Sequence, residues 1–191
     1  NSVDFELDKI NCLDTLRTGG LILYPTDTVW GIGCDATDEQ AVQRIIHIKH
    51  RPDAKSFVIL AKDWDAAAEV ADSISEGMIQ FREQSSKPVT FILNNACNLA
   101  PSVINSDGTV AVRIPTDEFC LQLLHSFGKP IVSTSANISG SSTPAFFRSI
   151  EDVIRQKMDY IALYRQEDTT PRQGSTIIKE NRDGEIVILR P

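Results

Sequence analysis

Short apolar runs alternate with longer amphipathic segments along this chain. Runs in which most positions are apolar or β-branched predict strands at 21–24, 56–61, 88–94, 109–115, 130–137, 160–164, 174–180 and 185–191. Apolar residues at helical spacing predict helices at 5–17, 38–50, 117–128 and 149–156, and one or two more within 63–83.

The residues at the ends of these segments are typical starts and stops. Gly19-Gly20 would end the first helix, Asp38 would cap the second, and Gly128 would end the helix at 117–128. The turn at 181–184 would join the last two strands into a hairpin. This alternation predicts an α/β (α+β) fold, with a twisted, mixed parallel and antiparallel open sheet flanked by helices in one domain over 1–191.

Composition narrows the class of protein. With 191 residues, 41% of them hydrophobic, the chain can bury one substantial core. No apolar run is long enough to span a bilayer and the first residues are acidic, so we expect a cytoplasmic protein with no membrane partner. The four cysteines form no CxxC pair, which favours buried reduced thiols over a zinc site.

The formal net charge of −7 is unfavourable for a surface that coats nucleic acid. Any bound anion must therefore meet a local cluster of positive charge. The sequence holds such a cluster: Lys49, Arg51 and Lys55 surround a chain reversal at Pro52, a density that suits a triphosphate. Complementing the helix dipole would explain one of these cations but not three. A metal site at the i,i+3 pair of histidines in this stretch is the less favoured alternative.

Hydroxyl side chains gather beside three predicted strands, at 26–28, 133–137 and 174–176. Strand ends that open onto one crevice are where layered α/β proteins build ligand sites. Any one cluster could instead cap a helix or form a turn. Arg113 lies on an apolar strand and needs an anionic partner, for which an internal carboxylate and a ligand carboxylate or phosphate are equally plausible. Phosphate-loop, GxGxxG, HExxH and GxSxG motifs are absent, and no tuned protein base stands out.

Six ordered blocks resemble the YrdC family in its short TsaC form, over about residues 19–191: "YPTDTVWGIGCDA", "KHR", "KPVTFIL", "TVAVRIP", "STSAN" and "GSTIIK". The resemblance implies an open sheet around a large, locally positive cavity. It also implies a nucleotidyltransferase that makes L-threonylcarbamoyladenylate and pyrophosphate from L-threonine, bicarbonate and ATP. The product would serve to modify the tRNA adenosine next to the anticodon, through downstream transfer proteins. Mg²⁺ would accompany ATP without a dedicated protein site, and tRNA or another RNA is a further candidate partner.

The resemblance also implies roles for individual residues. Catalysis is assigned to Lys49 and Arg51, and both side chains are expected to face solvent in the cavity. Binding of threonine and bicarbonate is assigned to Thr26, Arg113, Ser133, Ser135 and Ser175, with Ser175 on the threonine side. Binding of ATP is assigned to Lys49, Arg51, Lys55, Thr109, Ser135, Asn137 and Arg190. Asp27 would brace its loop, and Gly31 and Gly33 would permit tight packing beneath it.

The sequence departs from the family pattern in three places. Ser56 stands where many members have proline, "RQGSTI" is an unusual lead-in to the last block, and the sequence stops at Pro191, from which we expect the short form and not the longer two-domain members. Two alternatives to the synthase remain. One is an RNA-binding module, which the negative charge disfavours, and the other is a YciO-like paralogue without this activity, which intact "KHR" and "STSAN" disfavour.

Overall fold

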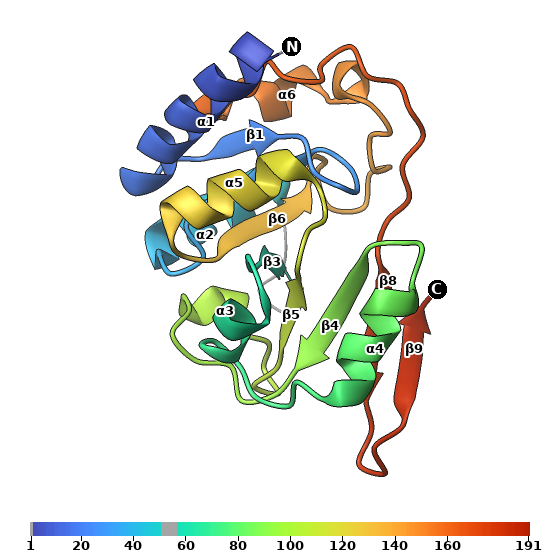
Figure 1. The fold of residues 1–191 in the computed structure, drawn as a ribbon. Helices are drawn as coiled ribbons and strands as arrows, with labels where there is room; N and C mark the ends of the chain where they lie inside the picture. The colour runs from blue at the N-terminus through green and yellow to red at the C-terminus, as the bar shows by residue number, and fades with distance from the viewer. Residues whose placement is uncertain (1, 51–56) are drawn as a thin grey trace.

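The computed structural model describes residues 2–50 and 57–191. Within these ranges, nine strands form one sheet in the order β7-β1-β2-β6-β3-β5-β4-β8-β9 (Figure 1). The strands are β1 (Ile22–Tyr24), β2 (Gly31–Gly33), β3 (Val58–Leu60), β4 (Val89–Leu93), β5 (Val110–Arg113), β6 (Ile131–Ser135), β7 (Tyr160–Ile161), β8 (Thr176–Glu180) and β9 (Ile186–Arg190). The pairs β1–β7, β3–β5 and β4–β8 are parallel and the other pairs are antiparallel. The prediction of a mixed sheet is confirmed.

The helices agree with the predicted segments, with differences at their ends. They are α1 (Ser2–Arg17), α2 (Glu39–Lys49), α3 (Trp64–Ala68), α4 (Glu76–Gln84), α5 (Glu118–Phe127) and α6 (Asp152–Arg155), with 3₁₀ turns η1 (Pro101–Val103) and η2 (Phe147–Ser149). Asp38 caps α2 by accepting the backbone N–H groups of Gln40 and Ala41, and Gly128 ends α5 with a positive φ of 79°. Segment 63–83 forms two helices, and the predicted helix at 149–156 shrinks to the single turn of α6.

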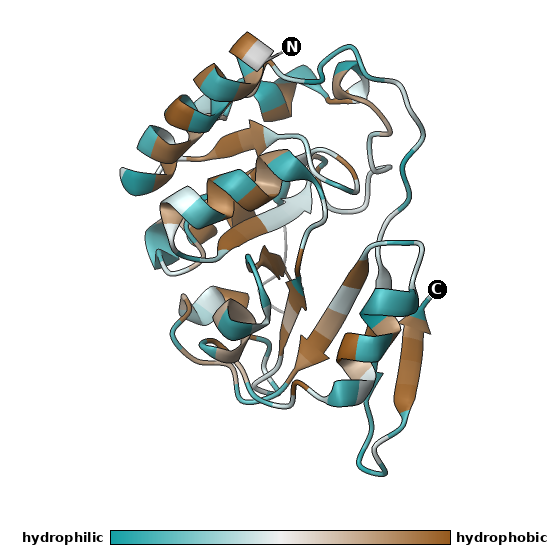
Figure 2. Cartoon of the chain, viewed as in Figure 1, coloured by the Kyte–Doolittle hydropathy of each residue, from teal (hydrophilic) through white to brown (hydrophobic). Residues whose placement is uncertain are grey.

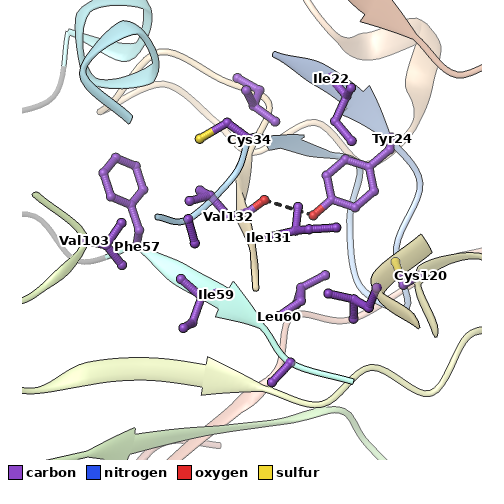
Figure 3. Close-up of a cluster of buried hydrophobic side chains, with 14 of the residues drawn as sticks. Ile22, Tyr24, Cys34, Phe57, Ile59, Leu60, Val103, Cys120, Ile131 and Val132 are labelled. Carbon is purple, nitrogen blue, oxygen red and sulfur yellow. Dashed lines mark hydrogen bonds between the residues drawn. The ribbon is translucent and has the colours of Figure 1, made fainter. Parts of the chain in front are cut away.

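Strand β2 was not predicted, because two of its three residues are glycines and glycine is depleted in strands. These glycines allow the close approach of neighbouring groups, as expected. A Cβ on Gly33 would lie 2.6 Å from the Tyr24 ring and 2.8 Å from the carbonyl oxygen of Val132. The Tyr24 side chain occupies the space beside Gly33, and its hydroxyl donates to the carbonyl oxygen of Val132 at 3.0 Å (Figure 3).

The central core lies on the face of the sheet toward which Val110 and Val112 of β5 point, and consecutive buried residues in β1, β3 and β6 extend it to the other face. Val110 and Val112 of β5 are fully buried and join a cluster that includes Ile59, Phe91 and Val132. The helices turn their polar positions outward, whereas the strands are mostly hydrophobic (Figure 2). No helix of the described residues is long and apolar enough to cross a membrane.

The cysteines are only partly as predicted. Cys12, Cys34 and Cys120 are free and buried, and burial raises the pKa of each thiol, so they are expected to be unreactive. Cys97 is free but exposed, so the expectation of a buried thiol was wrong for this residue.

Candidate active site

A cavity of about 620 Å³ opens on the other face of the sheet. Side chains alternate between the two faces of a strand, which explains which residues form the floor of the cavity. The floor lies on the face opposite the central core and is formed by Ala111 and Arg113 of β5, Val58 of β3 and Ile92 of β4. Ser133 and Ser135 of β6 continue this face, beside Gly31 of β2. The rest of the lining comprises Thr28, Val29, Trp30, Thr134, Thr143, Gly174, Ser175, Ile177, Leu189 and Arg190. The cavity thus combines alcohol groups, two guanidinium groups and an apolar wall.

Five of the predicted site residues line this cavity together: Arg113, Ser133, Ser135, Ser175 and Arg190. They come from β5, β6 and β9 and from Ser175, the residue directly before β8, at sequence positions as far apart as 113 and 190. The hydroxyl clusters at 133–137 and 174–176 therefore contribute to one crevice, as expected from the sequence.

Arg113 has the internal partner that the sequence left open. Its Nη2 lies 3.2 Å from Oδ1 of Asp27, and both side chains are only 5% exposed. The contact has the distance of an ion pair without the alignment of a hydrogen bond, and Nε and Nη2 of Arg113 have no hydrogen-bond partner among the described residues. Oδ2 of Asp27 accepts the backbone N–H of Thr116 at 3.2 Å, so Asp27 braces its loop as predicted. A buried guanidinium that faces a cavity with unused donors is suited to bind an anion.

Lys49 is almost fully buried, so the expectation that it faces solvent was wrong. Its ammonium donates to the carbonyl oxygen of Ser135 and lies 3.5 Å from the hydroxyl of the same residue. Lys49 therefore lies directly behind a residue of the cavity wall. Arg51 and Lys55, the other two members of the predicted phosphate cluster, lie outside the described residues, as does Ser56.

Three other predicted residues do not line the cavity. The hydroxyl of Thr26 is buried in its own loop, where it donates to the Val29 carbonyl at 2.6 Å and accepts the backbone N–H of Thr28 at 3.0 Å. Thr28, not Thr26, lines the cavity. The Thr109 hydroxyl donates to Asp107 at 2.6 Å.

Asn137 does not line the cavity but is hydrogen-bonded to Ser135, which does. Its Oδ1 accepts the Ser135 hydroxyl, and its Nδ2 donates to the carbonyl of Ser141 at 2.9 Å. The amide therefore links β6 to the loop that follows it. A hydroxyl cluster in a sequence does not reveal which of its members faces the ligand and which holds the backbone.

Ser175 and Arg190 form one unit at the β8–β9 end of the cavity. The guanidinium of Arg190 donates to the Ser175 carbonyl from Nε at 3.0 Å and from Nη2 at 2.6 Å. The Ser175 hydroxyl shares a 2.6 Å hydrogen bond with Thr90 of β4. The family resemblance assigned Ser175 to threonine and Arg190 to ATP, but their contact places both residues at the same part of the cavity.

Sequence reasoning missed Thr90, which is hydrogen-bonded to the cavity residue Ser175, and Thr143, which lines the cavity. Thr90 interrupts an otherwise apolar strand two positions before the cavity residue Ile92, and this alternation is the signal that could have identified it. Thr143 lies in a loop without a strand period and gave no such signal. Within 2–50 and 57–191, no group of three or more His, Cys, Asp or Glu side chains is arranged to hold a metal ion.

Comparisons with known proteins agree with this architecture. The Sua5_yciO_yrdC family model, described as "Telomere recombination", matches residues 14–191. The chain is 33% identical over 174 residues to a protein of Pseudoalteromonas translucida named threonylcarbamoyl-AMP synthase, covering 90% of this chain and 91% of the relative. It is 31% identical over 178 residues to a protein of the same name from Vibrio cholerae, covering 92% and 93%.

Solved structures also resemble this chain over nearly all of its length. Sua5 of P. abyssi complexed with L-threonine superposes with a TM-score of 0.83 at 28% identity, over 97% of this chain and 54% of that one. The chain therefore spans about half the length of that Sua5. YciO of E. coli superposes with a TM-score of 0.78 at 25% identity, over 97% of this chain and 89% of that one. By its sequence and its fold, this chain belongs to the Sua5/YciO/YrdC family.

Proposed function

We propose that this protein is a threonylcarbamoyl-AMP synthase, which makes L-threonylcarbamoyladenylate and pyrophosphate from L-threonine, bicarbonate and ATP. The observation that carries the proposal is the single cavity in which Arg113, Arg190 and the β6 serines meet. Relatives that bear this name align with nine-tenths of the chain, and a family structure was solved with L-threonine. Modification of a tRNA adenosine by downstream transfer proteins is the use we propose for the product.

The chemistry needs anion binding more than proton transfer. The amine of threonine condenses with bicarbonate, forming a C–N bond and releasing water, to give a carbamate. A carboxylate oxygen of this carbamate attacks the α-phosphorus of ATP as the bond to pyrophosphate breaks. Because this nucleophile is already anionic, the protein has to align two anions and stabilise the charge of the leaving group. A cavity of hydroxyl and guanidinium donors without a tuned base suits this task.

Within this scheme, Arg113 would hold the carboxylate of threonine, because its Nε has no hydrogen-bond partner among the described residues and its side chain lines the cavity. Ser133 and Ser135 would donate to carbamate and phosphate oxygens. Lys49 and Arg51 would bind the triphosphate, and Mg²⁺ would arrive on the ATP phosphates. Lys49 could reach the phosphates by exchanging its bond to Ser135 for one to the ligand.

The test is incubation of the purified protein with MgATP, L-threonine and bicarbonate, followed by mass-spectrometric detection of the adenylate and measurement of pyrophosphate. Omission of any one substrate should abolish the product. Arg113→Ala should raise the KM for L-threonine at least tenfold, whereas Arg44→Ala, at a surface ion pair, should leave it unchanged. Unchanged threonine dependence in Arg113→Ala would remove Arg113 from the site.

The same preparation separates the alternatives. If no adenylate forms and the protein retains RNA with an affinity that falls steeply with salt, the RNA-binding alternative replaces the synthase. If neither is observed, a YciO-like paralogue with another activity is the better description, in agreement with the shared fold.

A further inference from the structure

We propose that Arg165 is a positioning residue, which holds the cavity loop (residues 25–30) in the shape that receives L-threonine. This inference rests on the proposed function. Arg165 belongs to the crossing segment (residues 162–175), which runs from β7 to β8 along one side of the molecule (Figure 1). No motif in the sequence marks this residue.

The guanidinium of Arg165 reaches the cavity loop directly. Its Nη2 donates to the carbonyl oxygen of Thr26 at 3.0 Å, and its side chain is only 16% exposed. Asp117 lies 3.9 Å from Nη1 and Asp168 lies 3.6 Å from Nε. An arginine is suited to this position because its planar fork can hold a carbonyl and two carboxylates at once, which the single ammonium of lysine cannot.

Backbone geometry fixes where Arg165 can reach. Its φ is 65°, in the left-handed region that residues other than glycine rarely adopt. The two preceding backbone N–H groups, of Leu163 and Tyr164, donate to the carboxylate of Asp8 at 2.9 and 2.7 Å. Asp8 is fully buried in α1, and its Oδ1 also accepts the Tyr160 hydroxyl at 2.6 Å. The first helix therefore anchors the crossing segment at the point from which Arg165 extends.

The contact at Thr26 controls the part of the loop that lines the cavity. Since the Thr26 hydroxyl binds both Thr28 and Val29, a shift of Thr26 would move two residues of the cavity lining. Asp27, the next residue, is the ion-pair partner of Arg113. Arg165 is thus hydrogen-bonded to the loop that carries Asp27, and Asp27 orients Arg113, the arginine proposed to bind the carboxylate.

Charge balance gives Arg165 a second effect on the same loop. Burial and the nearby charge of Asp27 both raise the pKa of Asp117. Arg165 offsets the negative charge of Asp117 and so leaves Asp27 free to pair with Arg113. Loss of the Arg165 side chain would leave the mutual repulsion of Asp117 and Asp27 without the positive charge that now offsets it.

The test compares steady-state kinetics of the full chain in wild-type form with Arg165→Ala, Arg165→Lys and the matched control Arg172→Ala. Arg172 shares Asp168 with Arg165, at 3.1 Å, but within the described part of the chain it makes no hydrogen bond or ion pair with the cavity loop. Arg165→Ala should raise the KM for L-threonine at least tenfold while the KM for ATP changes less than twofold. Arg165→Lys should show the same split at a smaller size, about threefold, and Arg172→Ala should match the wild type.

Several outcomes would overturn the inference. Equal increases in both KM values, a lower kcat with unchanged KM values, or the same effect in Arg172→Ala would each show that Arg165 acts only through general structure. If Arg165→Ala does not fold, the milder Arg165→Lys variant decides, and its failure to raise the threonine KM overturns the proposal. An active wild type with an unaffected variant refutes this inference alone, whereas a wild type that makes no adenylate refutes the proposed function and this inference with it.

Discussion

The buried pair Arg113–Asp27 allows the electrostatics of the cavity to be measured without turnover. At the observed 3.2 Å, two unit charges attract by about 5 kcal/mol at an effective dielectric constant of about 20. Removing one partner of such a pair leaves the other charge buried and costs about 3–5 kcal/mol. Since Arg113 lines the cavity and is not enclosed in the apolar core, we expect the lower end, about 3 kcal/mol, for Asp27→Asn and for Arg113→Met.

The magnitude converts to a measurable thermal shift. Unfolding entropy near 60 °C is about 2.1 cal/mol/K per residue, which gives about 0.4 kcal/mol/K for the 191 residues. A loss of about 3 kcal/mol should therefore lower Tm by about 7 °C. The double variant Asp27→Asn/Arg113→Met should lose less than the sum of the two single losses, with a coupling energy of about 2 kcal/mol.

Denaturant unfolding of the four proteins forms the double-mutant cycle. Arg44→Met serves as the control, because Arg44 makes an ion pair with Asp159 in which both side chains are more than 40% exposed, and we expect it to cost less than about 1 kcal/mol. Additive losses from the two single variants would refute the reasoning, since they would mean that Asp27 and Arg113 do not interact. A second readout concerns the ligand: saturating L-threonine should raise Tm in the wild type and not in Arg113→Met.

Two further predictions concern stability. Gly33→Ala should destabilise the protein by about 1–3 kcal/mol in denaturant unfolding, because the new methyl group would overlap the Tyr24 ring and the Val132 carbonyl. Gly31→Ala, for which the nearest contact of the new methyl group is 3.0 Å, should cost less, and equal losses in the two variants would contradict this. Burial raises the pKa of Asp117, so its contribution to stability is present below about pH 4 and is lost as the pH rises through the folded-state pKa. Asp117→Asn, which can still cap α5, should therefore gain stability relative to the wild type between about pH 4 and about pH 7, and a pH-independent difference would contradict this.

The fold was predictable where burial dominates. Continuous apolar runs such as 130–137 identified the central strands, and capping residues such as Asp38 and Gly128 fixed helix ends to within a residue or two. Strand β2 was not predictable in the same way, because it contributes one side chain, Ile32, between two glycines. Its place in the sheet depends on partners that are distant in the sequence.

The sequence indicated five residues that line the cavity, but not the contacts that the predicted residues make. Lys49 was expected to face solvent in the cavity as a phosphate ligand, yet it is almost fully buried and its ammonium donates to a carbonyl oxygen of β6. Thr26 and Thr28 are equivalent in the sequence, and only the loop conformation decides that Thr28 lines the cavity. Asp8 and Arg165 carried no local signal, since their importance arises from contacts with residues more than 130 positions away.

The arrangement around Arg113 shows how an acidic protein can prepare a site for an anion. If Asp27 neutralised Arg113 completely, a ligand carboxylate would gain little by binding there. The observed contact involves Nη2 and lacks hydrogen-bond alignment, and Nε has no hydrogen-bond partner among the described residues. Asp27 therefore lowers the cost of burying the guanidinium and sets its orientation, while donors remain for a second anion. A cation held in this way can bind a carboxylate in the folded protein without being an uncompensated buried charge in its absence.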